Sequence, residues 1–145
     1  MAKPGKLSVE DQLDIQGLYA FYNLASDAAN VETYVDCFTV DGEMLSPEVG
    51  IEVRGAAALV AHKERDKASR AGQYRRHWNG NLFLELLNDG SVRGRCYLIA
   101  YNGKPGGLPA IADCGAYEDI LVKKEDGWKF ARRTLTMDGS TWNKK

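Results

Sequence analysis

Long apolar runs and clusters of basic residues are both missing from this 145-residue chain. No apolar stretch approaches the roughly 20 residues that a bilayer-spanning helix needs. The polar start MAKPGK has no secretory hydrophobic region, so we expect a cytoplasmic location. The net charge is −1 and the lysines and arginines are dispersed, so no basic stripe is available to follow a phosphate backbone. We therefore expect neither a membrane nor a nucleic acid as a partner.

Metal ligands and nucleotide-binding motifs are also scarce. Cys37, Cys96 and Cys114 are odd in number and have apolar neighbours, a pattern typical of reduced, buried thiols. The two histidines, His62 and His77, form no HxH or HxxxH pair. No GxGxxG follows a predicted strand, and GKPGG lacks the spacing of a P-loop. The sequence therefore predicts a protein that needs no metal and no nucleotide cofactor.

What the chain does have is enough apolar sequence, 44%, for one domain over residues 1–145. Hydrophobic periodicity and turn signals predict three helices and five strands. The expected helices are 8–27, 31–38 and 55–70, and the expected strands are 43–45, 76–87, 91–101, 111–124 and 128–137. Helices grouped against one face of an antiparallel meander are typical of an α+β domain.

Several finer expectations follow from the same patterns. Apolar residues cover more than half of the first helix, so we expect it to be largely enclosed. The second half of helix 55–70 is highly charged, so it should project into solvent with His62 exposed. Pro47 makes strand 43–45 an edge strand or ends it. The glycine-rich and proline-rich segment 103–109 should form a loop.

The stretch 73–87, QYRRHWNGNLFLELL, reads as a central strand that ends in an Asn-Asp-Gly turn. Polar residues precede its leucines at alternating positions: His77, Asn79 and Asn81. A wholly structural strand would carry aliphatic residues there, so this mismatch is the first sign of a site. A bulge at Gly80 would bring His77 round to the face of the leucines.

A series of segments along residues 8–137 resembles the SnoaL-like branch of the NTF2-like superfamily. The segments are IQGLYAFYNLASD (15–27), DCFTVDGEM (36–44), VRGAAAL (53–59), YRRHWNGNLFLE (74–85) and DGWKFARR (126–133). They are most similar to the branch of scytalone dehydratase, bile acid 7α-dehydratase and hexachlorocyclohexane dehydrochlorinase. The resemblance implies a cone-shaped NTF2-like fold, in which a curved antiparallel sheet wraps around the N-terminal helices.

The resemblance also implies roles for four residues. In that branch an Asp at a helix end orients a strand His that removes a proton, and these positions fall on Asp27 and His77. Tyr22 and Arg133 match a tyrosine and a basic residue of relatives and are candidates to assist the leaving group. The residues expected to line the substrate pocket are Phe38, Met44, Leu98, Asp113, Tyr117 and Leu135.

Each role has a structural alternative. Asp27 could simply end its helix, and Tyr22 could be a core aromatic residue with its hydroxyl satisfied. Strand parity leaves open whether Arg132 or Arg133 points inward. Asp113 would be an unpaired carboxylate among apolar groups unless it serves the site or meets an arginine.

We therefore predict a cofactor-independent lyase acting on a hydrophobic small molecule by dehydration, dehydrohalogenation or retro-aldol-type fragment release. Relatives that act on lignin-derived compounds make aromatic or polycyclic substrates plausible. The alternatives are a ketosteroid-isomerase-like isomerase or polyketide cyclase, or a non-catalytic subunit like the β subunits of ring-hydroxylating dioxygenases. The outer face of the sheet, with residues such as Trp78 and Arg95, must be either covered by another subunit or exposed to solvent. The resemblance implies a homotrimer, with a dimer as the alternative.

Overall fold

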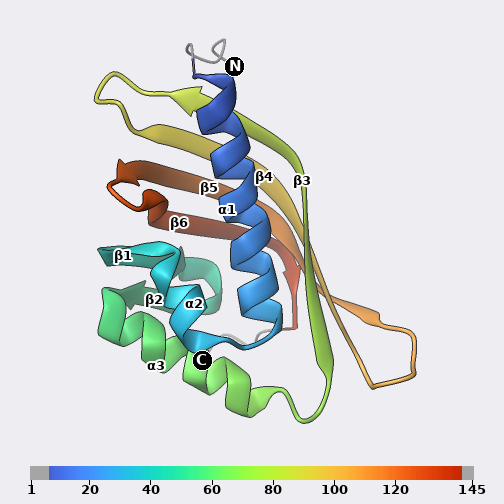
Figure 1. Cartoon of the computed structure of the whole chain (residues 1–145). Coiled ribbons are helices and arrows are strands. Elements are labelled where there is room, and N and C mark those ends of the chain that lie inside the picture. Colours follow the sequence, from blue (N-terminus) through green and yellow to red (C-terminus); the bar gives the residue numbers. More distant parts are fainter. Residues whose placement is uncertain (1–6, 142–145) are drawn as a thin grey trace.

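A computed structural model describes residues 7–141 of the chain (Figure 1). Its helices are α1 (Val9–Asp27), α2 (Val31–Asp36) and α3 (Ala56–Ser69), with a short 3-10 turn η1 (Pro47–Val49). Its strands are β1 (Phe38–Ser46), β2 (Ile51–Arg54), β3 (Tyr74–Leu86), β4 (Val92–Gly103), β5 (Ala110–Lys124) and β6 (Gly127–Ser140). The segment MAKPGK lies outside the described residues. Within those residues, no helix is both long and apolar enough to cross a bilayer.

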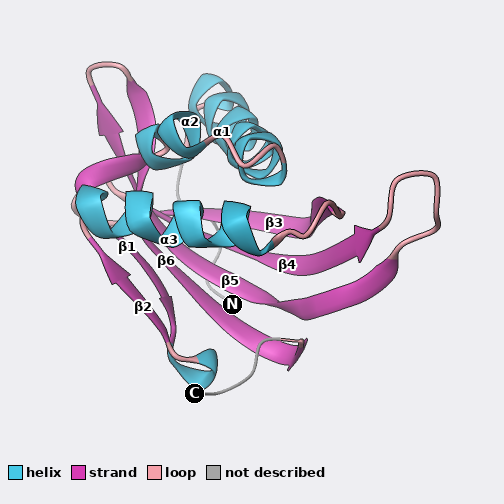
Figure 2. Ribbon diagram, turned by 90° about the horizontal axis from the view of Figure 1, so that it is seen from below, coloured by secondary structure: helices cyan, strands magenta, loops and turns pink. Residues whose placement is uncertain are grey.

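The six strands form one curved, unclosed sheet in the order β2-β1-β6-β5-β4-β3. The predicted meander from β3 to β6 is confirmed, and β1 joins it by pairing in parallel with β6. Figure 2 shows the sheet curving around the space in which the helices lie. The α+β class is therefore confirmed, and the concave side of the sheet faces α1.

Two strands differ from the prediction. β1 begins at Phe38, which we expected at the end of the second helix, and it ends just before Pro47. A register shift between Phe38 and Glu43 interrupts the alternation of side chains, so the sequence pattern showed only the last part of the strand. β2 was missed because four residues between Gly50 and Gly55 give too short a pattern to recognise.

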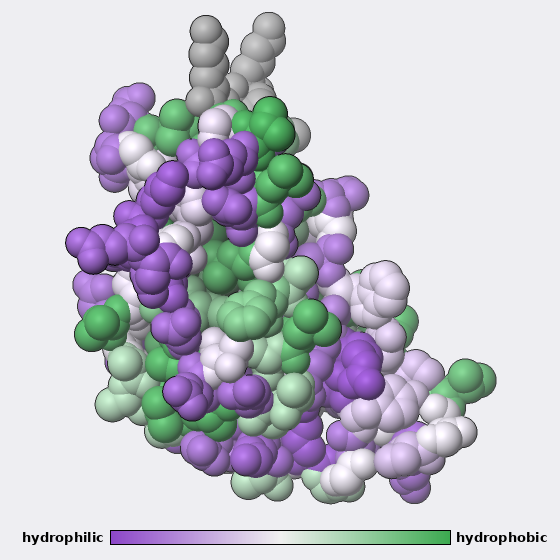
Figure 3. Space-filling model, in the orientation of Figure 1, coloured by the Kyte–Doolittle hydropathy of each residue, from purple (hydrophilic) through white to green (hydrophobic). Residues whose placement is uncertain are grey.

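Helix α1 begins as predicted, with the Ser8 hydroxyl accepting a hydrogen bond from the Asp11 N–H at 3.0 Å. The expectation that it is enclosed is wrong. Leu13, Phe21 and Leu24 are 61%, 51% and 69% exposed, and apolar surface is visible on the side of the molecule that carries α1 (Figure 3). The sheet curves past one side of the helix only. The buried residues therefore form a single stripe: Ile15, Tyr19, Tyr22, Ala25 and Ser26.

One side of the charged half of α3 packs against the domain, which corrects the expectation that this half projects into solvent; Glu64, Arg65 and Lys67 on its other side are exposed. Lys63 and Asp66 are buried and His62 is half-buried. Lys63 and Asp66 form an ion pair with Nζ 3.0 Å from Oδ2. Such pairing is what allows charged side chains to be buried at all.

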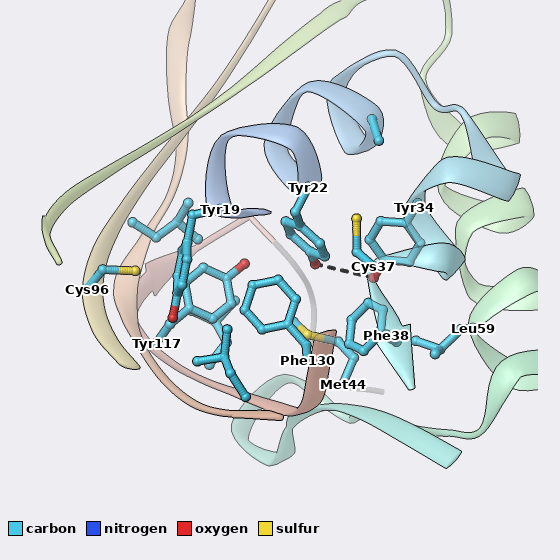
Figure 4. Packing of buried hydrophobic residues seen from close by; sticks show 14 of the residues in the cluster. Tyr19, Tyr22, Tyr34, Cys37, Phe38, Met44, Leu59, Cys96, Tyr117 and Phe130 are labelled. Carbon is cyan, nitrogen blue, oxygen red and sulfur yellow. Dashed lines mark hydrogen bonds between the residues drawn. The ribbon is translucent and has the colours of Figure 1, made fainter. Parts of the chain in front are cut away.

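The core between α1 and the sheet is strongly aromatic (Figure 4). Neighbouring rings of five residues lie 5.1–5.9 Å apart, mostly edge-on or tilted, namely Tyr19, Tyr22, Tyr34, Phe38 and Phe130. The three cysteines are free thiols as expected, although one of them, Cys114, is only half-buried. These rings pack α1 and α2 against the strands that carry the candidate site.

Candidate functional site

A bulge in β3 places His77 on the inner face of the sheet. His77 pairs with Ala100, and beyond the bulge Leu84 pairs with Gly94, so both lie on the buried face of β4. The register shifts in between, where Asn81 has a positive φ of 58°. The bulge that the sequence left open at Gly80 is therefore present, between Gly80 and Phe83. It lets the imidazole and the leucines share one face despite their opposite parity.

The His77 imidazole contacts the carboxylate at the end of α1. Its Nδ1 lies 2.5 Å from Asp27 Oδ1, and its backbone N–H donates to Asp27 Oδ2 at 3.2 Å. Arg70, the residue that follows α3, donates to the carbonyl oxygens of Ser26 and Asp27 at 2.6 and 2.5 Å. These bonds satisfy free carbonyl groups of the last helical turn and so fix the position of the carboxylate.

This contact determines which nitrogen of His77 can act as a base. A carboxylate beside Nδ1 favours the tautomer that carries its hydrogen there and donates it to Asp27. Nε2 then keeps its lone pair, and no hydrogen-bond partner meets it within residues 7–141. Burial lowers the pKa of His77 below its ordinary value of 6.5 and outweighs the opposing effect of Asp27. The imidazole is therefore neutral at pH 7 and able to accept a proton.

A narrow cavity of about 50 Å³ lies beside His77 on the concave side of the sheet. It has room for water molecules only. Met44 and Met137 are part of its wall, and their flexible side chains can move aside for a larger ligand. Six predicted site residues line it together with His77: Tyr22, Met44, Leu98, Asp113, Tyr117 and Leu135.

Three predicted site residues do not line this cavity: Asp27, Phe38 and Arg133. Asp27 meets the cavity only through its contact with His77, whereas the expected placement of Phe38 and Arg133 is corrected. Phe38 packs among the core rings instead. Arg133 is fully buried, with Nε and Nη2 donating to Asp119 at 2.9 and 3.0 Å. Its guanidinium lies over the Tyr117 ring, 3.7 Å from the centroid. A register shift in the pairing of β5 with β6 turns Arg133 inward and leaves Arg132 exposed.

Tyrosine hydroxyls are the neutral donors of the cavity wall. The Tyr22 hydroxyl donates to that of Tyr34 at 3.3 Å, a contact drawn in Figure 4, and Tyr117 lines the same cavity. Burial raises the pKa values of all three phenols above their ordinary value of 10. They therefore keep their protons at neutral pH and can donate hydrogen bonds.

The carboxylate of Asp113 is satisfied without an arginine. It accepts hydrogen bonds from the Ser140 hydroxyl at 2.6 Å and from the Thr141 N–H at 3.3 Å. This pairing explains how Asp113 can be buried in the cavity wall. In the part of the chain that the structure describes, no three His, Cys, Asp or Glu side chains are grouped as metal ligands would be.

Sequence reasoning missed the polar residues that α3 and β3 bring to the cavity: His62, Lys63, Asp66 and Arg75. The sequence pattern indicated a solvated helix face for the three helical residues and no role for Arg75. A signal was nevertheless present, since Leu59, Lys63, Asp66 and Arg70 recur at helical spacing and form one stripe. The buried Leu59 marks that stripe as the packed side of the helix.

Comparisons with known proteins agree with this architecture. The model of the SnoaL-like domain family matches residues 7–134. ActVI-ORFA of Streptomyces coelicolor is 25% identical, with a TM-score of 0.79 over 88% of this chain and 97% of that chain. A Catenulispora acidiphila protein in complex with S-DNPA is 24% identical, with a TM-score of 0.79 over 90% and 96% of the two chains.

An NTF2-like protein of Novosphingobium aromaticivorans with a cystatin-like fold is 23% identical. Its TM-score is 0.75, over 92% of this chain and 86% of that chain. The comparison with curated proteins found no match. The predicted NTF2-like fold is thus confirmed, and the chain belongs to the SnoaL-like domain family.

Proposed function

We propose that this protein is a cofactor-independent lyase in which His77, oriented by Asp27, removes a proton from carbon. The observation that supports it most directly is the 2.5 Å contact of Nδ1 with the Asp27 carboxylate, which leaves Nε2 free beside a cavity. A general base must be unprotonated at the working pH and close to the proton that it accepts. Burial supplies the first condition by lowering the pKa of His77.

In the proposed reaction the substrate C–H bond breaks and its proton moves to Nε2. Asp27 stabilises the resulting imidazolium through the hydrogen bond at Nδ1. The electron pair that the C–H bond leaves behind ends in a new C=C bond, and the leaving group departs from the neighbouring carbon. When that group is hydroxide, it takes the proton back from the imidazolium, so water is released and His77 returns to its neutral form.

The leaving group needs a donor, and the tyrosines suit this role better than Arg133. Tyr22 lies in the cavity wall with its proton held by a raised pKa, and its hydroxyl can exchange the long 3.3 Å bond to Tyr34 for one to the leaving group. Arg133 instead is ion-paired with Asp119 behind that wall. We therefore assign assistance of the leaving group to Tyr22 and a structural role to Arg133.

The cavity favours a hydrophobic substrate, and an aromatic one in particular. Aromatic rings of Tyr22, Tyr34 and Tyr117 are part of its wall beside the polar residues, and the two methionines of the wall can adapt to ring shapes. The solved complex of the Catenulispora protein with S-DNPA supports a small-molecule ligand for this fold. We accordingly propose aromatic or polycyclic substrates, including lignin-derived ones.

Turnover of aromatic and steroid-like alcohols and halides tests this proposal. His77→Gln removes the base. In Asp27→Asn the side-chain amide can donate to Nδ1, which places the imidazole hydrogen on Nε2 and removes the lone pair that would accept the proton. Each variant should lower kcat by about 10²–10⁴-fold while the fold is retained. Asp36→Asn, which neutralises an exposed carboxylate on α2, is the matched control and should leave kcat unchanged. Retained turnover in His77→Gln would remove the residue from the mechanism, and a folded protein that turns over none of these compounds would favour a binding subunit.

We also propose that the chain forms a homotrimer through the outer face of the sheet, with a dimer as the alternative. That face exposes large apolar side chains, among them Trp78, Tyr97 and Ile99 at 63%, 60% and 46%. Exposed apolar patches of this kind often mark protein interfaces. Light scattering of the wild type and of Trp78→Glu tests this assignment, because a charge in the interface should shift the mass towards the monomer. A monomeric wild type would overturn it.

A further inference from the structure

Lys63 is a buried cation in the cavity wall that the proposed reaction does not yet use. It is 4% exposed, and its Nζ donates to Ser26 Oγ at 2.8 Å and to Asp66 Oδ2 at 3.0 Å. Nζ also lies 4.2 Å from the centroid of the Tyr34 ring. An ammonium group has three N–H donors. Two of them meet oxygens and the third meets only the face of a ring, among the residues described.

The surroundings of Lys63 carry more positive than negative charge. Asp66 is shared by three cations, because Arg70 Nη2 lies 2.7 Å from Oδ2 and Arg75 Nη1 lies 3.3 Å from Oδ1. Asp66 alone cannot neutralise Lys63 and two arginines, and the carboxylate of Asp27 is engaged by His77 instead. The other carboxylate of the cavity wall, Asp113, is held by donors near the end of β6. This side of the cavity therefore attracts negative charge.

Lys63 also lies within electrostatic reach of the base. Both side chains line the same cavity. Burial lowers the pKa of His77, and the positive charges of Arg75 and Lys63 lower it further. A preorganised cation in a water-poor site stabilises charge that develops during a reaction far better than the same cation in water. Anchoring α3 alone would not require Lys63, because Arg70 and Arg75 also pair with Asp66.

We propose that Lys63 binds the substrate oxygen on which negative charge develops as His77 removes the proton. The inference rests on the lyase function proposed above. It restricts the substrates to compounds with a carbonyl group beside the carbon that loses its proton. The C–H electron pair forms a C=C bond and the carbonyl electrons move to oxygen, which gives an enolate beside the ammonium group. Collapse of the enolate restores the carbonyl and expels the leaving group from the β carbon.

Binding of para-nitrophenol tests this inference without turnover, because its yellow phenolate presents an oxyanion on an aromatic ring. Wild-type protein should bind the phenolate in preference to the phenol, so the pKa of the bound compound should fall. Lys63→Met should weaken binding of the phenolate about tenfold or more, the range expected for a lost charged hydrogen bond. Lys67→Met removes an exposed lysine from the same helix and should bind as the wild type does.

Equal binding of the phenolate by Lys63→Met and wild type would overturn the inference, as would a wild type that binds none at millimolar concentration. If Lys63→Met does not fold, Lys63→Gln keeps hydrogen-bond donors without the charge and is expected to lose the same preference. No bond breaks in this assay. Phenolate binding without any His77-dependent turnover would overturn the lyase and leave Lys63 as an oxyanion-binding residue only. His77-dependent turnover without phenolate binding would overturn only the role of Lys63.

Discussion

The ion pair between Arg133 and Asp119 offers the sharpest test of how the core behind the cavity wall is stabilised. Both side chains are fully buried, and two hydrogen bonds join them at 2.9 and 3.0 Å. The Tyr19 hydroxyl donates to the second carboxylate oxygen at 2.5 Å. Removing one charge leaves the other without a counter-ion in the core. Breaking a buried pair in this way typically costs about 3–5 kcal/mol.

The perturbations are Arg133→Met and Asp119→Asn, alone and together. Each single substitution should lower the free energy of unfolding by about 3–5 kcal/mol. At roughly 2–4 °C per kcal/mol for a chain of this size, the melting temperature should fall by about 6–20 °C. The double variant leaves no unpaired charge, and Asn can still accept from Tyr19. It should therefore cost no more than either single variant.

Urea unfolding followed by tryptophan fluorescence measures all three values. Lys123→Met is the control, because that lysine pairs with Asp11 at the surface and is 60% exposed. An exposed pair contributes about 0–1 kcal/mol, so its loss should barely shift the midpoint. Single variants that cost less than about 1 kcal/mol, or a double variant whose cost equals the sum of the singles, would refute the pairing described here.

Three further predictions concern the site and its supports. Burial lowers the pKa of His77, so as the pH falls the unfolded chain takes up a proton on this residue, near pH 6.5, before the folded chain does. The free energy of unfolding should therefore decrease as the pH drops below 6.5, and urea unfolding at several pH values checks this. Ser8→Ala removes the cap of α1 and should cost about 1 kcal/mol in the same assay. Gly94→Ala would push a methyl group into the Tyr19 hydroxyl and should destabilise by about 1–3 kcal/mol, whereas Gly80→Ala has open space and should change stability little.

Local signals in the sequence predicted the parts of this fold that depend on neighbouring residues. The Ser8 cap, the Asn-Asp-Gly turn after β3 and the end of β1 before Pro47 are all set within a few positions. The resemblance to the SnoaL-like branch paired Asp27 with His77, 50 residues apart, a contact that no local pattern predicts. The fold class followed from the order of elements alone.

What escaped prediction depends on contacts between distant parts of the chain. Whether Lys63 is solvated or buried depends on Ser26, 37 residues away, and on the arginines that share Asp66. The exposure of Leu24 depends on how far the sheet curves round α1. The inward turn of Arg133 depends on a shift in strand register. Periodicity reports the pattern along one element and cannot report these long-range arrangements.

The bulge in β3 makes the site depend on how many residues the strand contains as well as on which ones. His77 and Leu84 lie on the same face of β3 only because the bulge between them adds one residue that has no partner in β4. Deleting Asn81 would restore simple alternation and force either the imidazole or the leucines out into water. A conservative replacement at that position leaves the count intact. We therefore expect this family member to tolerate exchanges within the segment far better than losses or gains of a single codon.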